Sequence, residues 1–245
     1  MKLNCDLGES FGQWQMGLDD AVMPHIDMAN IACGFHAGDP LVINKTLALA
    51  KQHKVTIGAH PSYPDLVGFG RRSMKCSPDE LIALLHYQIG AIDSMAKNHG
   101  LQLTYVKPHG ALYNDMMADP AIFTTVLTAL SQYHTPLKLM VLAGALSDES
   151  LALSQQYGVE LLFEAFADRR YLDSGALTPR SVQGAVLSEQ AMLAQVEQLL
   201  KHHTVITHSG NTLAIVADTL CVHGDNLAAI AVIEKINALC QLARS

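Results

Sequence analysis

Three histidines of this chain each follow a short apolar segment with the composition of a buried strand. His36 and His60 follow two such segments, and His109 follows a third, two residues after Lys107. Imidazoles near carboxylates such as Asp6 suit general acid–base catalysis, and they equally suit a divalent metal bound through oxygen and nitrogen atoms. The residue types alone do not choose between these two chemistries.

Charged side chains occupy the same kind of position. An ammonium group is costly to bury without a partner, so Lys107 is expected to pair with a substrate carboxylate, a phosphate or an acidic side chain. Asp6 and Glu9 are expected to project beyond the first apolar segment, although a turn aspartate and a solvated glutamate explain them as well. The remaining candidates for binding the substrate or a phosphate are Arg71, Arg72, Glu164, Arg169, His223 and Asp225.

Purely structural roles remain open for several of these residues. His60 also fits a core histidine that is bonded to a carbonyl group. Adjacent arginines such as Arg71 and Arg72 are usually solvated. A surface salt bridge between Asp168 and Arg169 would explain these two residues equally well.

Strand-like and helical segments alternate along the chain and would position these side chains. Strands are expected at residues 1–6, 31–33, 55–59, 137–143, 159–163 and 204–207, with two more that end near residues 106 and 222. Helices are expected at 41–53, 77–100, 120–133, 147–158 and 188–202 and at the end of the chain, whereas 11–26 is expected to be irregular. An N-capping residue followed by proline marks three helix starts, at Asp39, Ser77 and Asp119, and Ser77 and Glu80 have the spacing of a capping box.

At least seven strand-like segments that alternate with helices predict an α/β protein with a parallel sheet. If this sheet closes into a β/α barrel, the carboxyl ends of the strands surround one mouth, where the polar residues meet. An open doubly wound sheet is the alternative. No linker or low-complexity tract interrupts the 245 residues, so one domain spanning 1–245 is expected.

The composition narrows the classes of partner and location. A formal net charge of -7 argues against nucleic acid and anionic membranes as partners. Five scattered cysteines without a C-x-x-C pair, no leader segment and no run of about 18 apolar residues favour a cytoplasmic protein. The P-loop, G-x-G-x-x-G, G-x-S-x-G and H-E-x-x-H motifs are absent from the sequence, which argues against a serine nucleophile.

Five longer motifs are spread over the whole chain. They are Asn-Cys-Asp-Leu-Gly-Glu at 4–9, Asn-Ile-Ala-Cys-Gly-Phe-His-Ala-Gly-Asp at 30–39, Gly-Ala-His-Pro-Ser-Tyr-Pro-Asp at 58–65, Val-Lys-Pro-His-Gly-Ala-Leu-Tyr-Asn at 106–114 and Cys-Val-His-Gly-Asp at 221–225. Together they resemble the LamB/YcsF family. The resemblance implies a distorted TIM-like (β/α) barrel of the glycoside hydrolase/deacetylase kind. It also implies ATP-dependent opening of 5-oxo-L-proline (pyroglutamate) to L-glutamate, together with subunits B and C.

This implied reaction suggests roles for the residues. ATP would activate the unreactive lactam by phosphorylating its carbonyl oxygen, after which water adds and the ring C–N bond breaks. The candidate catalytic residues are Asp6, His36, His60, Lys107 and His109. Asp6, His36 and His60 are also the candidate ligands of a divalent metal. The missing P-loop leaves open whether ATP contacts this chain or the partner subunits.

Two other functions remain open from the sequence. One is a metal-dependent hydrolase of the deacetylase kind that acts alone, with the ion held by the three candidate ligands. The other is a non-catalytic subunit that binds substrate or serves as a scaffold.

Overall fold

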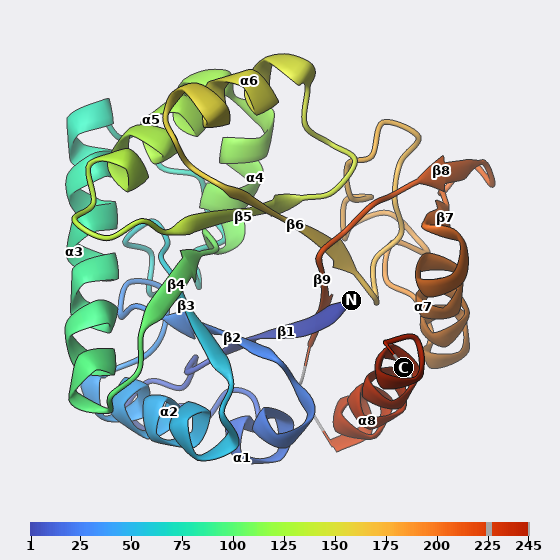
Figure 1. Cartoon of the computed structure of the whole chain (residues 1–245), viewed down its shortest axis with the longest axis horizontal. Coiled ribbons are helices and arrows are strands. Elements are labelled where there is room, and N and C mark those ends of the chain that lie inside the picture. The colour runs from blue at the N-terminus through green and yellow to red at the C-terminus, as the bar shows by residue number, and fades with distance from the viewer. Residues whose placement is uncertain (224–226, 245) are drawn as a thin grey trace.

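Seven parallel strands close into a barrel in the computed structural model, which describes residues 1–223 and 227–244 (Figure 1). The strands are β1 (Lys2–Leu7), β2 (Met28–Ala32), β3 (Thr56–His60), β4 (Leu103–Val106), β5 (Lys138–Leu142), β6 (Leu161–Phe166) and β9 (Thr219–Val222). Strands β1 to β6 pair in sequence order, and β9 closes the ring between β6 and β1. The prediction of a β/α barrel is therefore confirmed.

Helices cover the outside of the ring of strands (Figure 1). They include α2 (Pro40–His53), α3 (Pro78–Asn98), α5 (Pro120–Ser131), α6 (Asp148–Gln156), α7 (Glu189–His202) and α8 (Leu227–Leu242). The others are α4 (Gly110–Ala118), α1 (Asp19–Val22) and the 3-10 helix η1 (Met23–His25). The last two lie in the segment 11–26, which was expected to be irregular.

Side-chain caps explain where several helices begin. The Asp39 carboxylate accepts hydrogen bonds from two backbone N–H groups in the first turn of α2, and the Asp119 carboxylate caps α5 by accepting one, from Ala121. Ser77 and Glu80 form the expected capping box at the start of α3. These contacts satisfy N–H groups that have no partner inside their own helix, so the three expected helix starts are confirmed.

The expected strand at 204–207 lies outside the barrel. It is β7 (Thr204–Ile206), which pairs in antiparallel fashion with β8 (Thr212–Ala214). Two antiparallel strands can be joined by a short turn, whereas two parallel strands of one sheet need a long crossover connection. The strand β7 therefore pairs with β8, which follows it directly. The place that this strand would have taken in the barrel belongs to β9.

Apolar side chains fill part of the barrel interior. Met28, Tyr105 and Met140 pack together, and the Tyr105 hydroxyl donates a 2.7 Å hydrogen bond to Asn30 Oδ1. Gly58 on β3 leaves room for the Tyr105 ring, because a Cβ atom at this position would overlap the ring. The glycine is therefore a packing requirement of the barrel interior.

Replacing Gly58 with alanine is expected to lower the free energy of unfolding by about 1–3 kcal/mol, because the Tyr105 ring has to move within a packed interior. Gly90 in α3 provides a matched control, since a Cβ atom there meets nothing within 4 Å. Gly90→Ala is expected to leave stability unchanged or to raise it by up to about 1 kcal/mol. Urea unfolding measures both variants, and equal stabilities would contradict the packing described here.

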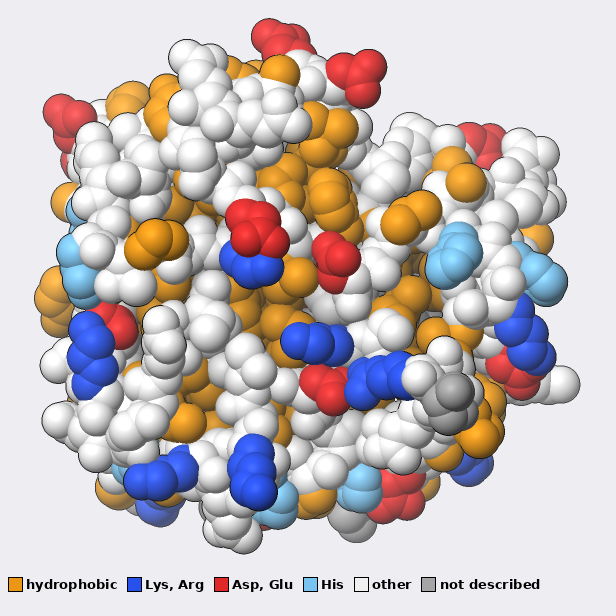
Figure 2. All heavy atoms as spheres, in the orientation of Figure 1, with side chains coloured by type: hydrophobic (Ala, Val, Ile, Leu, Met, Phe, Trp, Pro, Cys, Tyr) orange, Lys and Arg blue, Asp and Glu red, His pale blue; other side chains and the backbone are white. Residues whose placement is uncertain are grey.

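The amino-terminal end of the barrel is hollowed. A cavity of about 440 Å³ is lined there by residues that include Met28, Tyr105 and Leu162, with Lys2 and Lys138 at its edge. Figure 2 looks onto this face, where charged side chains lie around apolar surface. The candidate catalytic residues lie at the opposite end, which is the end that carries the active site in α/β barrels. Among the helices of the described ranges, none has the length and apolar character to span a membrane.

Candidate active site

Side chains from β1, β6 and β9 surround the ammonium group of Lys107, which follows β4. Its Nζ atom lies 3.0 Å from Asp6 Oδ1 and 2.7 Å from Glu164 Oε1. Asn4 Oδ1 and Cys221 Sγ each lie 3.4 Å from the same Nζ atom. Because Lys107 is 3% exposed and Glu164 is 0% exposed, these charges are paired in a region that water barely reaches.

The ion pairs show which kind of partner Lys107 has. Burial by itself would lower the pKa of Lys107, but attraction to Asp6 and the groups beside it raises the pKa well above its usual value. Burial would likewise raise the pKa of Asp6, and the positive charges of His60 and Lys107 instead hold it well below the usual range. Both side chains are therefore charged at neutral pH. Of the three expected partners of Lys107, the structure contains the acidic side chains.

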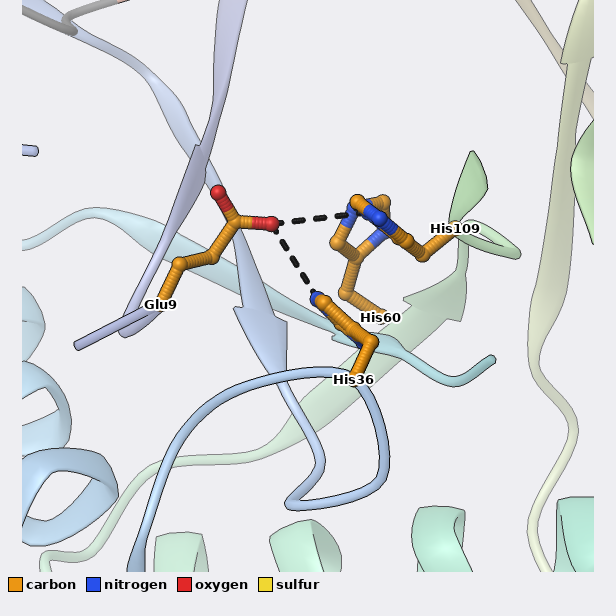
Figure 3. A group of neighbouring side chains, drawn as sticks. All are labelled: Glu9, His36, His60 and His109. Atoms are coloured by element: carbon orange, nitrogen blue, oxygen red, sulfur yellow. Dashed lines mark hydrogen bonds and ion pairs between the residues drawn. The ribbon is translucent and has the colours of Figure 1, made fainter. Parts of the chain in front are cut away.

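Glu9, His36, His60 and His109, which we call the histidine group, lie beside this network (Figure 3). His36 Nε2 lies 3.1 Å from Glu9 Oε1, and His109 Nδ1 lies 3.4 Å from the same oxygen. His60 Nε2 lies 2.9 Å from His109 Nδ1 and 3.4 Å from Asp6 Oδ2, so it connects the two sets of residues. The His36 and His109 rings stack in parallel, with centroids 3.7 Å apart.

Two backbone carbonyl groups fix the tautomers of the histidine group. His60 Nδ1 donates to the carbonyl oxygen of Lys107 at 2.7 Å, and His109 Nε2 donates to that of Phe69 at 2.9 Å. The two nitrogen atoms that face each other would then both carry lone pairs, which repel unless a proton or a cation lies between them. Burial, followed by the neighbouring His36 and His60, lowers the pKa of His109 to about 2, so His109 by itself stays neutral near pH 7.

Glu9 is a site residue that was missing from the catalytic candidates. It follows Gly8, whose φ of 71° turns the chain back over the end of the barrel. Burial and the negative charge of Asp6 raise the pKa of Glu9, against the attraction of His109. A carboxylate with a raised pKa is better suited to act as a general base near neutral pH than Asp6. The signal in the sequence was the position of Glu9, directly after a glycine turn at the end of a strand.

The loop after β3 packs against the histidine group. Gly70 has a φ of 63°, and a Cβ atom there would lie 2.8 Å from the side chains of both His36 and His109. The Phe69 ring lies edge-on to the same two imidazoles, with centroid distances of 5.4 and 5.1 Å. The loop therefore covers the stacked rings and limits the access of water to them.

The candidate arginines lie in three different surroundings. Arg72 is exposed and forms an ion pair with Asp65, with 3.0 Å between its Nε atom and Asp65 Oδ1. Arg71 is exposed, and its guanidinium carbon lies 5.1 Å from the centre of the Phe69 ring. Arg169 is buried and donates to a backbone carbonyl oxygen at 2.7 Å. Of the three, Arg71 is exposed and lies against Phe69 of the loop over the histidine group, whereas Arg72 is paired with Asp65 and Arg169 is buried.

His223 follows β9 and pairs with Asp168, with 3.1 Å between His223 Nδ1 and Asp168 Oδ2. In the part of the chain that the structure describes, the ion-pair partner of Asp168 is thus His223 and not Arg169. The last candidate, Asp225, lies outside the described residues. Glu164 is placed inside the barrel as a partner of Lys107.

Replacing Asp168 with asparagine is expected to change how stability depends on pH. Burial would lower the pKa of His223, but the charge and hydrogen bond of Asp168 outweigh it and raise the pKa. A raised pKa in the folded state gives stabilisation that is present below the unfolded-state pKa of about 6.5 and is lost as the pH rises through the folded-state value. Between about pH 6 and pH 8, thermal stability should therefore fall more for the wild type than for Asp168→Asn. Parallel curves for the two proteins would contradict this pairing.

A parallel barrel with buried acid–base groups at the carboxyl end of its strands has the architecture of a β/α-barrel enzyme. The sequence model of the LamB/YcsF family matches residues 1–244, and the chain belongs to this family. The resemblance inferred from the five motifs is therefore confirmed.

Individual relatives cover almost the whole chain. A Vibrio cholerae protein that is named as the A subunit of 5-oxoprolinase is 55% identical over 239 residues, which are 97% of this chain and 96% of the relative. A Pseudomonas putida protein whose name likewise makes it an A subunit of 5-oxoprolinase is 56% identical over 235 residues, which are 96% and 91% of the two chains. The crystal structure of the lactam utilization protein from Thermus thermophilus matches with a TM-score of 0.91 at 38% identity, over 100% of this chain and 97% of that one.

Proposed function

We propose that this chain is the A subunit of an ATP-dependent 5-oxoprolinase, which opens the ring of 5-oxo-L-proline to give L-glutamate. The observation that carries this proposal is the buried histidine group beside the Asp6–Lys107 ion pair, at the catalytic end of a barrel. The names of relatives that are 55% and 56% identical support it. The partners would be subunits B and C, with ATP as co-substrate. Use of ATP and the five free cysteines support a cytoplasmic location.

Opening a five-membered lactam requires a base for water and an acid for the ring nitrogen. ATP would transfer its terminal phosphoryl group to the carbonyl oxygen and leave as ADP. Water then adds to the carbonyl carbon and the ring C–N bond breaks, which leaves an acyl phosphate and the free amine. A second water hydrolyses the acyl phosphate, so that L-glutamate and phosphate are released. Glu9 takes the proton from water because its raised pKa suits a base, and the proton shared by His60 and His109 goes to the leaving nitrogen.

The substrate carboxylate and the transferred phosphoryl group need a cation. Lys107 does not meet this need, because Asp6 and Glu164 already neutralise it. We assign the role to Arg71, which is exposed beside the histidine group, with Arg169 and His223 as further candidates. In this scheme Lys107 fixes the position of Asp6, which in turn orients the His60 ring through a contact of 3.4 Å with His60 Nε2.

Reconstitution of the complex tests the proposal. The purified chain is combined with subunits B and C, and L-glutamate and ADP are measured with and without 5-oxo-L-proline. We expect the two products in equal amounts, and formation that depends on this chain. Turnover by subunits B and C alone at the rate of the full complex would contradict the proposed role.

A metal-dependent hydrolase that acts without partners is a second candidate function. The observation in its favour is that one donor atom from each member of the histidine group lies within 4.8 Å of the others. Three imidazoles and one carboxylate suit a divalent transition ion such as zinc, and metal-bound histidines typically donate their second N–H to a carbonyl group, as His60 and His109 do here. When bound, such an ion polarises a carbonyl group or activates water.

The ring geometry limits which residues would hold the ion together. The His36 and His109 rings are stacked in parallel, and the lone pair of a ring nitrogen lies in the plane of its own ring. The lone pairs of the two rings therefore do not point at one common ion. One of these two histidines would therefore bind it in this arrangement, and the set Asp6, His36 and His60 remains a proposal.

Metal analysis and chelator treatment separate the two functions. A metal-free preparation that is fully active in the complex rules out the second function, and a bound ion that sustains amide hydrolysis by this chain alone supports it.

A further inference from the structure

Hydrogen bonds hold the segment after Glu9 in one shape. We call residues 10–18 the Trp14 hairpin. Phe11 and Trp14 exchange two backbone hydrogen bonds of 2.9 Å. The Ser10 hydroxyl accepts from the Met16 N–H group at 2.9 Å and lies 3.1 Å from the Met16 carbonyl oxygen, to which it donates. A segment that is ordered before binding loses little conformational entropy when it binds.

The Trp14 hairpin presents apolar side chains to water. Trp14 is 66% exposed, Met16 is 43% exposed and Leu18 is 37% exposed. The hairpin is bonded to Asp39 at the start of α2, where Leu41 is 63% exposed. Apolar side chains that stay exposed to water do not stabilise the fold, and a group of them commonly marks an interaction site. Tryptophan is enriched at the centre of protein interfaces. The surface therefore has the features of a binding surface.

The hairpin begins at the edge of the candidate active site. Glu9 directly precedes it, with its carboxylate 3.1 Å from His36 Nε2. A hydrogen bond of 2.9 Å from the Gly8 N–H group to Asp19 Oδ2 closes the base of the segment. A protein bound to the hairpin would therefore lie next to the histidine group and would contact the segment that carries Glu9.

The sequence around the hairpin is acidic. Residues 3–44 contain no Lys or Arg. Of the acidic residues in this range, Asp6 pairs with Lys107 and Asp27 pairs with Arg244. Among the described residues, the other four have no ion pair with Lys or Arg, and these are Glu9, Asp19, Asp20 and Asp39. A surface of this sign repels the phosphates of ATP and attracts a partner face that carries Lys and Arg. Charge complementarity thus selects a basic partner over a second copy of this chain, whose formal net charge is -7.

We propose that the Trp14 hairpin is the docking surface for a partner subunit whose contact face has an apolar pocket surrounded by Lys and Arg. The inference rests on the proposed function, because that function requires partner subunits. The basic face of the docked subunit binds ATP and brings it to the edge of the site. The acidic surface of this chain would repel the phosphates of ATP. Contact with the hairpin also fixes the position of Glu9 in the assembled enzyme.

Binding of the full chain to co-purified subunits B and C tests the docking surface by titration calorimetry. Trp14→Ala is expected to weaken binding by at least about tenfold, and Asp20→Lys by about three- to tenfold with a smaller dependence on salt. Val216→Ser is the matched control, since Val216 is 75% exposed on a different loop. All three variants should unfold at the temperature of the wild type, because the changed side chains are exposed.

A fluorine label adds a direct readout. Trp14 is the single tryptophan of the chain, so fluorotryptophan incorporated into this protein gives one resonance, which should shift when subunits B and C are added. Unchanged binding by Trp14→Ala overturns the docking surface while the proposed function stands. A shift caused by 5-oxo-L-proline alone, or by self-association of this chain, overturns it as well. If the wild type binds neither partner, the proposed function fails together with the docking surface.

Discussion

Replacing Lys107 with methionine is expected to lower the free energy of unfolding by about 3–5 kcal/mol and to abolish glutamate formation by the complex. The methionine leaves the carboxylates of Asp6 and Glu164 without their common cation inside the barrel. A buried charge without a partner is strongly destabilising, because it has lost its water and gained nothing in return. Urea unfolding of the purified chain measures the effect on stability, and the reconstituted complex measures the effect on activity.

Two comparisons make the Lys107 prediction specific. Lys97 pairs with Asp93 on the surface of α3, and Lys97→Met should cost less than about 1 kcal/mol because water screens that pair. Adding Glu164→Gln to Lys107→Met should restore part of the lost stability, since it removes one of the two unpaired charges. Equal losses for the Lys97 and Lys107 variants would contradict the buried network.

Replacing His109 with glutamine is expected to lower the rate of ATP-coupled glutamate formation by about 10²- to 10⁴-fold, which is the usual contribution of a general acid or base. The glutamine side chain cannot hold the proton that His60 shares with His109 at 2.9 Å. The loss should appear in kcat, because a proton donor to the leaving nitrogen acts mainly in the transition state.

His134 offers a matched control for this variant. Its side chain is 60% exposed and lies 3.3 Å from Asp93, which does not belong to the histidine group. His134→Gln should leave both kcat and stability unchanged. Turnover of His109→Gln within twofold of the wild type would remove this histidine from the catalytic role.

Local signals in the sequence predicted the helices well. Ser77 and Glu80 are three residues apart, and the capping box that they form depends on nothing beyond that turn. Asp39 followed by proline marks a helix start for the same reason. Each of these features is decided by contacts within a few residues, so these helix starts were readable without knowledge of the fold. The short helices α1, η1 and α4 and the strand β8 were not expected from the sequence.

Contacts between distant residues account for what the sequence left open. From the sequence, Lys107 could pair with a substrate carboxylate, a phosphate or an acidic side chain. In the structure it pairs with Asp6, which is 101 positions away in the chain. Glu9 was indistinguishable from a solvated glutamate until the barrel brought His36 and His109 to it. The strand β7 has an acceptable strand pattern, yet its hairpin partner β8 keeps it out of the barrel. Such choices depend on tertiary structure rather than on local pattern.

Binding of 5-oxo-L-proline to the histidine group is tested most directly by NMR of the imidazole rings in the assembled complex. We expect the signals of His36, His60 and His109 to shift when the substrate is added, while those of exposed histidines such as His134 remain in place. Unchanged signals from the histidine group under conditions in which the complex forms glutamate would contradict catalysis at this end of the barrel.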